Sequence, residues 1–218
     1  MTQDPESREL PTWLEPVRRV AQEVVPEQLS RFLPPAEGGR ESAVLMLFGE
    51  TTRGPDILLI ERAHDMRSHA GQPAFPGGAV DPDDDGPVAA ALREAHEETG
   101  LDPTGVHVFG SLPALFLPPS GFVVTPVLGW WHSPVDVRAV DAHEVASVHR
   151  VEIAALTEPN NRGSVRHPSG YVGPAFEVED LVVWGFTGGL LARVIALAGW
   201  EKPWDSERTL TLPDGAWD

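Results

Sequence analysis

Three glutamates within one helical turn are the residues of this sequence best suited to chemistry. Glu94, Glu97 and Glu98 stand at positions i, i+3 and i+4, so a helix would place them on one face. Like charges at this spacing repel each other, at roughly 0.2–0.5 kcal/mol per pair on an exposed helix. A divalent cation would turn this repulsion into attraction, and Mg²⁺ and Mn²⁺ prefer carboxylate oxygens. The trio therefore predicts a metal site, with a solvated acidic helix face as the alternative.

The residues around the trio predict the helix that must carry it. Gly86 and Pro87 mark its beginning, because proline suits the first turn. Gly100 fits the left-handed residue that ends a helix. A second face is expected to be buried, and apolar or small residues recur on it at helical spacing: Val88, Ala91, Leu92, Ala95 and Thr99. Arg93 adjoins the trio and could fix one carboxylate by pairing with it.

The segment from Gly78 to Leu101 resembles the Nudix box. That box reads Gly, five residues, Glu, seven residues, then Arg-Glu-U-x-Glu-Glu-x-Gly-U, where U is a bulky apolar residue. The second half matches residues 93–101, with a small alanine at the first U. The first half departs from the pattern, because eight residues separate Asp84 from Arg93. Asp84 or Asp85 is then the equivalent of the first glutamate.

A second motif, over residues 58–78, resembles the signature of the coenzyme A pyrophosphatase branch of the Nudix hydrolases. It reads Leu-Leu-x-x-Arg, Arg-x-His-x-Gly-Gln and Phe-Pro-Gly-Gly, with Glu61 where a threonine is often found. The resemblance implies a set of substrate-binding residues: Arg62, Arg67, His69, Gln72, Phe75, Gly77 and Gly78. Arginine suits bidentate phosphate contacts. The alternatives are arginines paired with nearby acids, a hydrogen-bonded loop histidine, and a phenylalanine that packs rather than stacks.

The resemblance covers most of residues 40–200 and implies an α/β fold, an α/β/α sandwich around a mixed β-sheet with the box as a loop–helix–loop. It implies metal-dependent hydrolysis of coenzyme A or acyl-CoA to 3′,5′-ADP and (acyl-)4′-phosphopantetheine. Glu94, Glu97, Glu98 and the carbonyl of Gly78 would hold Mg²⁺ or Mn²⁺ and so activate a water. Glu94 is either a ligand or the general base, and Arg93 would orient a carboxylate.

Two other functions remain open. The same fold could cleave ADP-ribose, NADH or another nucleoside diphosphate derivative. A non-catalytic module could instead bind a nucleotide and regulate another process. The intact trio of glutamates favours an enzyme over such a module.

The composition limits the partners that we expect. The 218 residues include 16 basic and 33 acidic side chains, a net charge of −17, which disfavours nucleic acid and anionic membranes. The absence of cysteine excludes disulfides, cysteine zinc sites and a thiol nucleophile. Residues 181–200 are apolar enough to be weighed as a membrane span, but four glycines and Arg193 favour a buried helix. We expect a cytoplasmic enzyme with a small CoA-like nucleotide substrate, and a homodimer as is common in the superfamily.

The resemblance implies a Nudix hydrolase domain over residues 40–200. We expect an N-terminal helical extension (1–39) before it and a loosely attached tail (201–218) after it. Strands are predicted at 43–48, 57–60, 106–109, 122–129 and 145–151. Helices are predicted at 9–25, 88–99 and 184–198. The first helix is expected to pack on the main body, with a dimer arm or a lid as the alternative role.

Overall fold

A mixed β-sheet forms the centre of the molecule. The computed structural model describes residues 9–63, 71–118, 120–167 and 170–213. The sheet has eight strands: β1 (Arg40–Thr51), β2 (Gly54–Arg62), β3 (Pro73–Ala74), β4 (Gly77–Ala79), β5 (Val106–Ser111), β6 (Leu115–Leu117), β7 (Phe122–Trp131) and β8 (Val145–Glu152). The central order is β3-β2-β1-β7-β5, and β4, β6 and β8 pair with β1, β7 and β2. Strands β1 and β7 run parallel and the other pairs antiparallel, so the predicted mixed sheet is confirmed.

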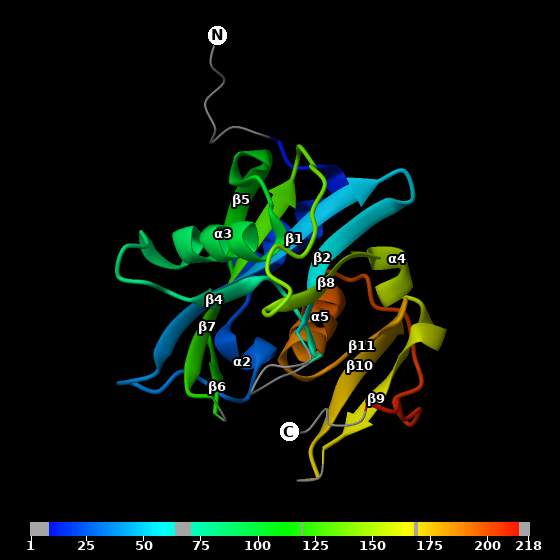
Figure 1. Cartoon of the computed structure of the whole chain (residues 1–218). Coiled ribbons are helices and arrows are strands. Elements are labelled where there is room, and N and C mark those ends of the chain that lie inside the picture. Colours follow the sequence, from blue (N-terminus) through cyan, green and yellow to red (C-terminus); the bar gives the residue numbers. More distant parts are fainter. Residues whose placement is uncertain (1–8, 64–70, 119, 168–169, 214–218) are drawn as a thin grey trace.

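Helices cover both faces of this sheet. They are α1 (Glu15–Glu23), α2 (Pro26–Leu29), α3 (Gly86–Thr99), α4 (Ile153–Leu156) and α5 (Gly185–Leu197), with short 3₁₀ turns at Thr12–Leu14, Pro103–Gly105 and Pro159–Asn161. Side chains of β1 alternate between two hydrophobic clusters, as a strand requires. Leu45 and Leu47 pack with the alanines of α3, whereas Met46 and Phe48 pack with α1 and α5. Figure 1 shows α3 on one side of the sheet and α5 on the other, which is the predicted α/β/α sandwich.

A second, three-stranded sheet was not expected from the sequence. It consists of β9 (Arg162–Arg166), β10 (Val172–Val178) and β11 (Leu181–Val183), in the order β11-β10-β9. Strand β11 takes the first residues of the apolar run that begins at Leu181, and α5 takes the rest. The helix predicted at 184–198 is therefore confirmed, and within the described ranges no helix has the length and apolarity to span a membrane.

The N-terminal segment packs on the main body. Leu14 and Val17 are fully buried in the same cluster as β1 and α5. The helix is shorter than predicted, since Val24 adopts an extended conformation. Pro26 then starts α2, because proline suits a first helical turn.

The C-terminal segment is attached more firmly than predicted. Leu210 is 6% exposed, and its N–H donates to the carbonyl of Ser164 in β9 at 2.9 Å. The N–H of Ser164 donates in turn to the carbonyl of Arg208 at 2.8 Å. The prediction of a loosely attached tail is therefore wrong for residues 208–210, because backbone hydrogen bonds join them to the smaller sheet.

Candidate active site

Strand β4, an acidic loop and α3 form a loop–helix–loop beside β1. Strand β4 pairs with β1, with Gly77 opposite Val44 and Gly78 opposite Ala43. The loop closes where the carboxylate of Asp84 accepts the N–H of Asp81 at 2.8 Å. Helix α3 begins at Gly86 and ends at Gly100, whose φ of 71° is left-handed, as predicted. One prediction on the buried face is wrong: Val88, in the first turn of α3, is 38% exposed, whereas Ala91 and Ala95 are fully buried.

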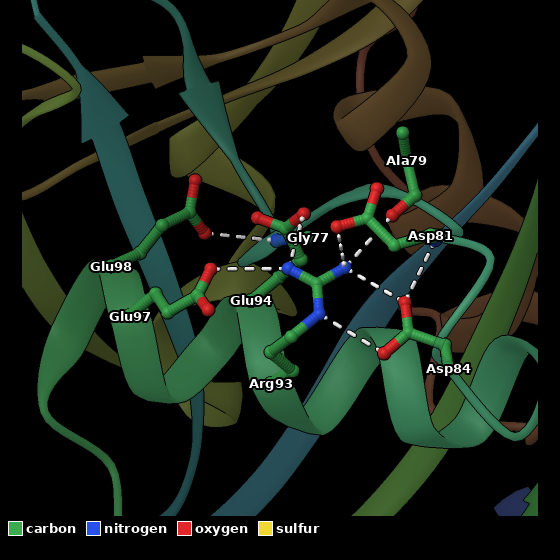
Figure 2. Close-up of polar contacts among 8 residues, drawn as sticks. All are labelled: Gly77, Ala79, Asp81, Asp84, Arg93, Glu94, Glu97 and Glu98. Carbon is green, nitrogen blue, oxygen red and sulfur yellow. Dashed lines mark hydrogen bonds and ion pairs between the residues drawn. The ribbon is translucent and has the colours of Figure 1, made fainter.

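Arg93 connects the carboxylates at the centre of the site (Figure 2). Its Nε and Nη2 donate to the two oxygens of Asp84 at 3.0 and 2.8 Å. Its Nη1 donates to Glu94 at 3.0 Å and to Glu97 at 3.1 Å. Nη2 also donates to the carbonyl of Ala79 at 3.1 Å. The predicted pairing of Arg93 with one carboxylate therefore extends to hydrogen bonds with three, and Asp81 adds an ion pair at 3.7 Å.

Asp84 is the acid that Arg93 contacts through two hydrogen bonds. Its side chain is 7% exposed, and the hydrogen bond from Arg93 is the main reason that its pKa lies below the usual value. Asp85, the other candidate, is the residue before α3 and caps no backbone N–H with its side chain. Of the two candidates for the first glutamate of the box, Asp84 is therefore the one that contacts Arg93.

Glu98 is the most deeply buried of the three glutamates. It is 6% exposed, and its Oε2 accepts the N–H of Gly77 at 2.9 Å. Burial raises its pKa to about 7, although the Gly77 hydrogen bond and the charge of Arg62 oppose the shift. The negative charges of Glu94 and Glu144 raise the pKa of Glu98 further. A buried carboxylate with so little compensation is suited to a positive partner.

Glu94 lies against the backbone of β4. A methyl group added at Gly78 would overlap the Glu94 carboxylate, so any side chain there would displace the end of Glu94. At Gly77 the added methyl would overlap the carbonyl of Ala43. Burial raises the pKa of Glu94, and the hydrogen bond from Arg93 opposes this shift. Glu94 therefore lies against Gly78, and Glu98 accepts the N–H of Gly77 (Figure 2).

The donor set fits a hard divalent cation, but its carboxylates are engaged elsewhere. In the described ranges no group of three or more acidic or histidine side chains is arranged to hold a metal ion. Arg93 engages Glu94 and Glu97, and Glu97 is 55% exposed at its side chain. The buried, under-compensated charge of Glu98 beside Glu94 is the feature that a cation would relieve.

Arg62 is the residue of the upstream motif (residues 58–78) whose charge acts on the glutamates of the site. This arginine ends β2, and its charge lowers the pKa of Glu98. Its backbone N–H donates to the carbonyl of Gln72 at 3.1 Å. Phe75 is 2% exposed and packs in the larger hydrophobic cluster, so its side chain does not face a substrate. Arg67 and His69 lie outside the described residues.

Glu144 is a charged neighbour of the site that the sequence did not indicate. Its carbonyl accepts the N–H of Ala63 at 2.9 Å, which holds it beside the end of β2. Its negative charge contributes to the raised pKa of Glu98. The contact depends on the pairing of β8 with β2, so no local pattern around residue 144 could have revealed it.

Comparison with known proteins places these features in a family. A NUDIX domain model matches residues 39–169. The Nudix hydrolase NudL of Citrobacter koseri is 40% identical over 183 residues, covering 78% of this chain and 91% of that protein. NudL of Escherichia coli K12 is 37% identical over 171 residues, covering 75% and 85%. A Nudix hydrolase from M. smegmatis, RenU, has the same fold with a TM-score of 0.54 at 20% identity, covering 78% of this chain and 91% of that one. The chain therefore belongs to the Nudix hydrolase family.

Proposed function

We propose that this Nudix hydrolase cleaves the phosphoanhydride bond of coenzyme A or an acyl-CoA in the presence of Mg²⁺ or Mn²⁺. The products would be 3′,5′-ADP and (acyl-)4′-phosphopantetheine. The observation that supports this best is the 2.9 Å hydrogen bond between Gly77 and Glu98. It joins the motif that resembles the CoA branch to the glutamates of the box, and the charge of Arg62 in that motif lowers the pKa of the same carboxylate.

In this proposal one set of side chains binds the substrate phosphates and another set binds the metal ion. Arg62 binds a substrate phosphate, because a guanidinium suits bidentate contact with phosphate oxygens. Arg67, His69 and Gln72 complete the phosphate site in this proposal. Glu98 and Glu97 are metal ligands, with the carbonyl of Gly78 as a further donor.

Arg93 is a positioning residue for Glu94, and Glu94 acts on the metal ion or on the attacking water. Arg93 holds Glu94 in place while Asp84 anchors the guanidinium from the other side. Glu94 is a third ligand or the base that takes the proton of the attacking water. When bound, the ion supplies charge neutralisation of the diphosphate and a more acidic water.

A substrate panel tests the proposal. CoA, acetyl-CoA, ADP-ribose and NADH are each incubated with Mg²⁺, with Mn²⁺ or with EDTA, and the products are separated by chromatography. We expect 3′,5′-ADP from CoA with either metal and none in EDTA, and the variant Glu98→Gln serves as the inactive control. Cleavage of ADP-ribose with CoA intact would refute the substrate. Lack of turnover of all four would favour the non-catalytic alternative. The cytoplasmic location and the homodimer stay predictions.

A further inference from the structure

A chain of hydrogen bonds ends one residue before Arg62, on the other face of the sheet. The Oγ of Ser147 donates to Oε2 of Glu61 at 2.8 Å and lies 2.6 Å from Nε2 of His149. The Nδ1 of His149 lies 3.4 Å from Oε2 of Glu179. These residues come from β2, from β8 and from the turn between β10 and β11. The chain thus connects the larger sheet to the smaller one.

The direction of the protons identifies the role of Ser147. A serine hydroxyl has one proton, and here it is donated to Glu61, so Nε2 of His149 must donate to Ser147. The order serine, histidine, acid resembles a hydrolytic triad, but in such a triad the histidine accepts the serine proton. Ser147 is therefore a structural link between Glu61 and His149.

Glu179 is placed in this chain by an unusual backbone. It is the one non-glycine residue with a positive φ, 53°, in the part of the chain that the structure describes. A two-residue turn between Val178 and Leu181 favours glycine at such a position. A glutamate in its place brings its Oε2 to 3.4 Å from Nδ1 of His149, a contact that is a hydrogen bond when both ring nitrogens carry protons.

A β-bulge separates Glu61 from Arg62. Glu61 pairs with Ser147, but Arg62 pairs with Val145, so Ala146 is the extra residue in β8. Bulges redirect side chains and occur next to active sites. Since side chains alternate along β2, Glu61 faces the smaller sheet and Arg62 faces α3 and Glu98. The hydrogen-bonded pair at Glu61 and Ser147 therefore holds the strand at the point where Arg62 is directed into the site.

We propose that Ser147 and His149 are positioning residues, which act through Glu61 and the bulge to aim Arg62 at a substrate phosphate. The proposal rests on the proposed function in one respect, the contact between Arg62 and the substrate. The Nε of Arg62 is buried and has no hydrogen-bond partner among the described residues. The backbone that carries this side chain is held by the Glu61–Ser147 pair on one side and by the hydrogen bond from the Arg62 N–H to the carbonyl of Gln72 on the other.

A double-mutant cycle tests the proposal. The dissociation constant of CoA is measured by calorimetry in EDTA, and KM and kcat are measured with Mg²⁺. Ser147→Ala should raise the dissociation constant and KM about three- to tenfold and change kcat less than about twofold. Ser147→Thr keeps the hydroxyl and should restore both constants to within about twofold. Arg62→Ala should weaken binding about 10- to 100-fold, and adding Ser147→Ala to it should have no further effect.

The outcomes separate this inference from the proposed function. An equal effect of Ser147→Ala with and without Arg62 would overturn the positioning role, as would unchanged binding in the single variant. Either result leaves the substrate intact as long as Arg62→Ala weakens binding. If the wild-type chain does not bind CoA, the proposed function fails and the inference fails with it. A general loss of stability in Ser147→Ala would weaken CoA binding equally in the wild-type chain and in the Arg62→Ala variant. The cycle therefore distinguishes such a loss from a positioning role.

Discussion

Glu98 carries the least compensated charge among the glutamates of the site. One backbone N–H and the charge of Arg62 oppose its desolvation, yet its pKa remains at about 7. Because a carboxylate that is costly to ionise in the empty site gains most from a nearby cation, this residue links metal binding to stability. The Glu97 side chain, by contrast, is 55% exposed and keeps its contact with water.

Glu98→Gln should make the metal-free protein more stable while it removes activity. The native pKa lies above the 4.5 of an unfolded chain, so the native state binds more protons between pH 4.5 and 7. The stability of the wild-type protein relative to the variant therefore falls as pH rises through this window, by roughly 3 kcal/mol in total. Urea unfolding in EDTA from pH 4.5 to 8 measures the difference. Glu97→Gln is the matched control, and a difference that does not change with pH would contradict the prediction.

Asp84 and Asp85 should differ sharply in their effect on catalysis. Asp84→Asn breaks the bidentate contact with Arg93, which then holds Glu94 and Glu97 less firmly. We expect kcat to fall about tenfold or more, because small displacements of catalytic groups are costly. Asp85→Asn is the control and should leave kcat within about twofold. Equal losses in both variants, measured in the same metal buffer, would reject Asp84 as the acid that replaces the first glutamate.

At the scale of elements, Gly78 sets the distance between β4 and α3. In Gly78→Ala the methyl group would displace the Glu94 carboxylate, whose flexible end can move, so the fold should survive. We expect kcat to fall about 100-fold with a modest change in the unfolding midpoint. Gly189→Ala in α5 is the control, since its methyl meets no atom, and it should stabilise the protein by about 0.5–1 kcal/mol. Wild-type kcat in Gly78→Ala would show that Glu94 has no fixed position in catalysis.

The elements that the sequence predicted are those with a local signal. Apolar runs marked β1, β2, β5, β7 and β8, and helical spacing with glycine at the end marked α3. Strands β3 and β4 are too short to show a period, and β9 and β10 are interrupted by polar residues, glycine and proline. Their partners, rather than their own residues, make them strands.

The same distinction applies to the site. Spacing was enough to group the three glutamates with Arg93, since all four lie within two helical turns. That Arg93 engages two of them at once, and that Asp84 reaches it, depends on how the acidic loop folds back on α3. Glu144 and the Ser147–His149 chain depend on pairing between strands far apart in the sequence, which no local pattern encodes.

At the scale of the whole molecule, Arg162 fastens the C-terminal segment to the smaller sheet. Its side chain is 1% exposed and lies between the rings of Phe176 and Trp204, 4.9 and 4.5 Å from their centroids. Its Nη1 donates to Glu201 at 2.8 Å. The arrangement buries a positive charge far along the chain from the candidate site, with its acidic partner in the segment after α5.

Glu201→Ala should therefore destabilise the whole molecule without slowing the reaction. Removing the acid leaves a buried guanidinium without its charged partner, which costs roughly 2–4 kcal/mol when the acid itself is partly exposed. Glu177→Ala is the matched control, because it removes an exposed acid from the partly exposed Arg208 and should cost less than about 1 kcal/mol. Urea unfolding followed by circular dichroism measures both, and kcat at 25 °C should equal the wild-type value in each variant. If the two substitutions cost the same, the C-terminal segment is not held by Arg162 and contributes to stability through Leu210 and its backbone pairing with Ser164 instead.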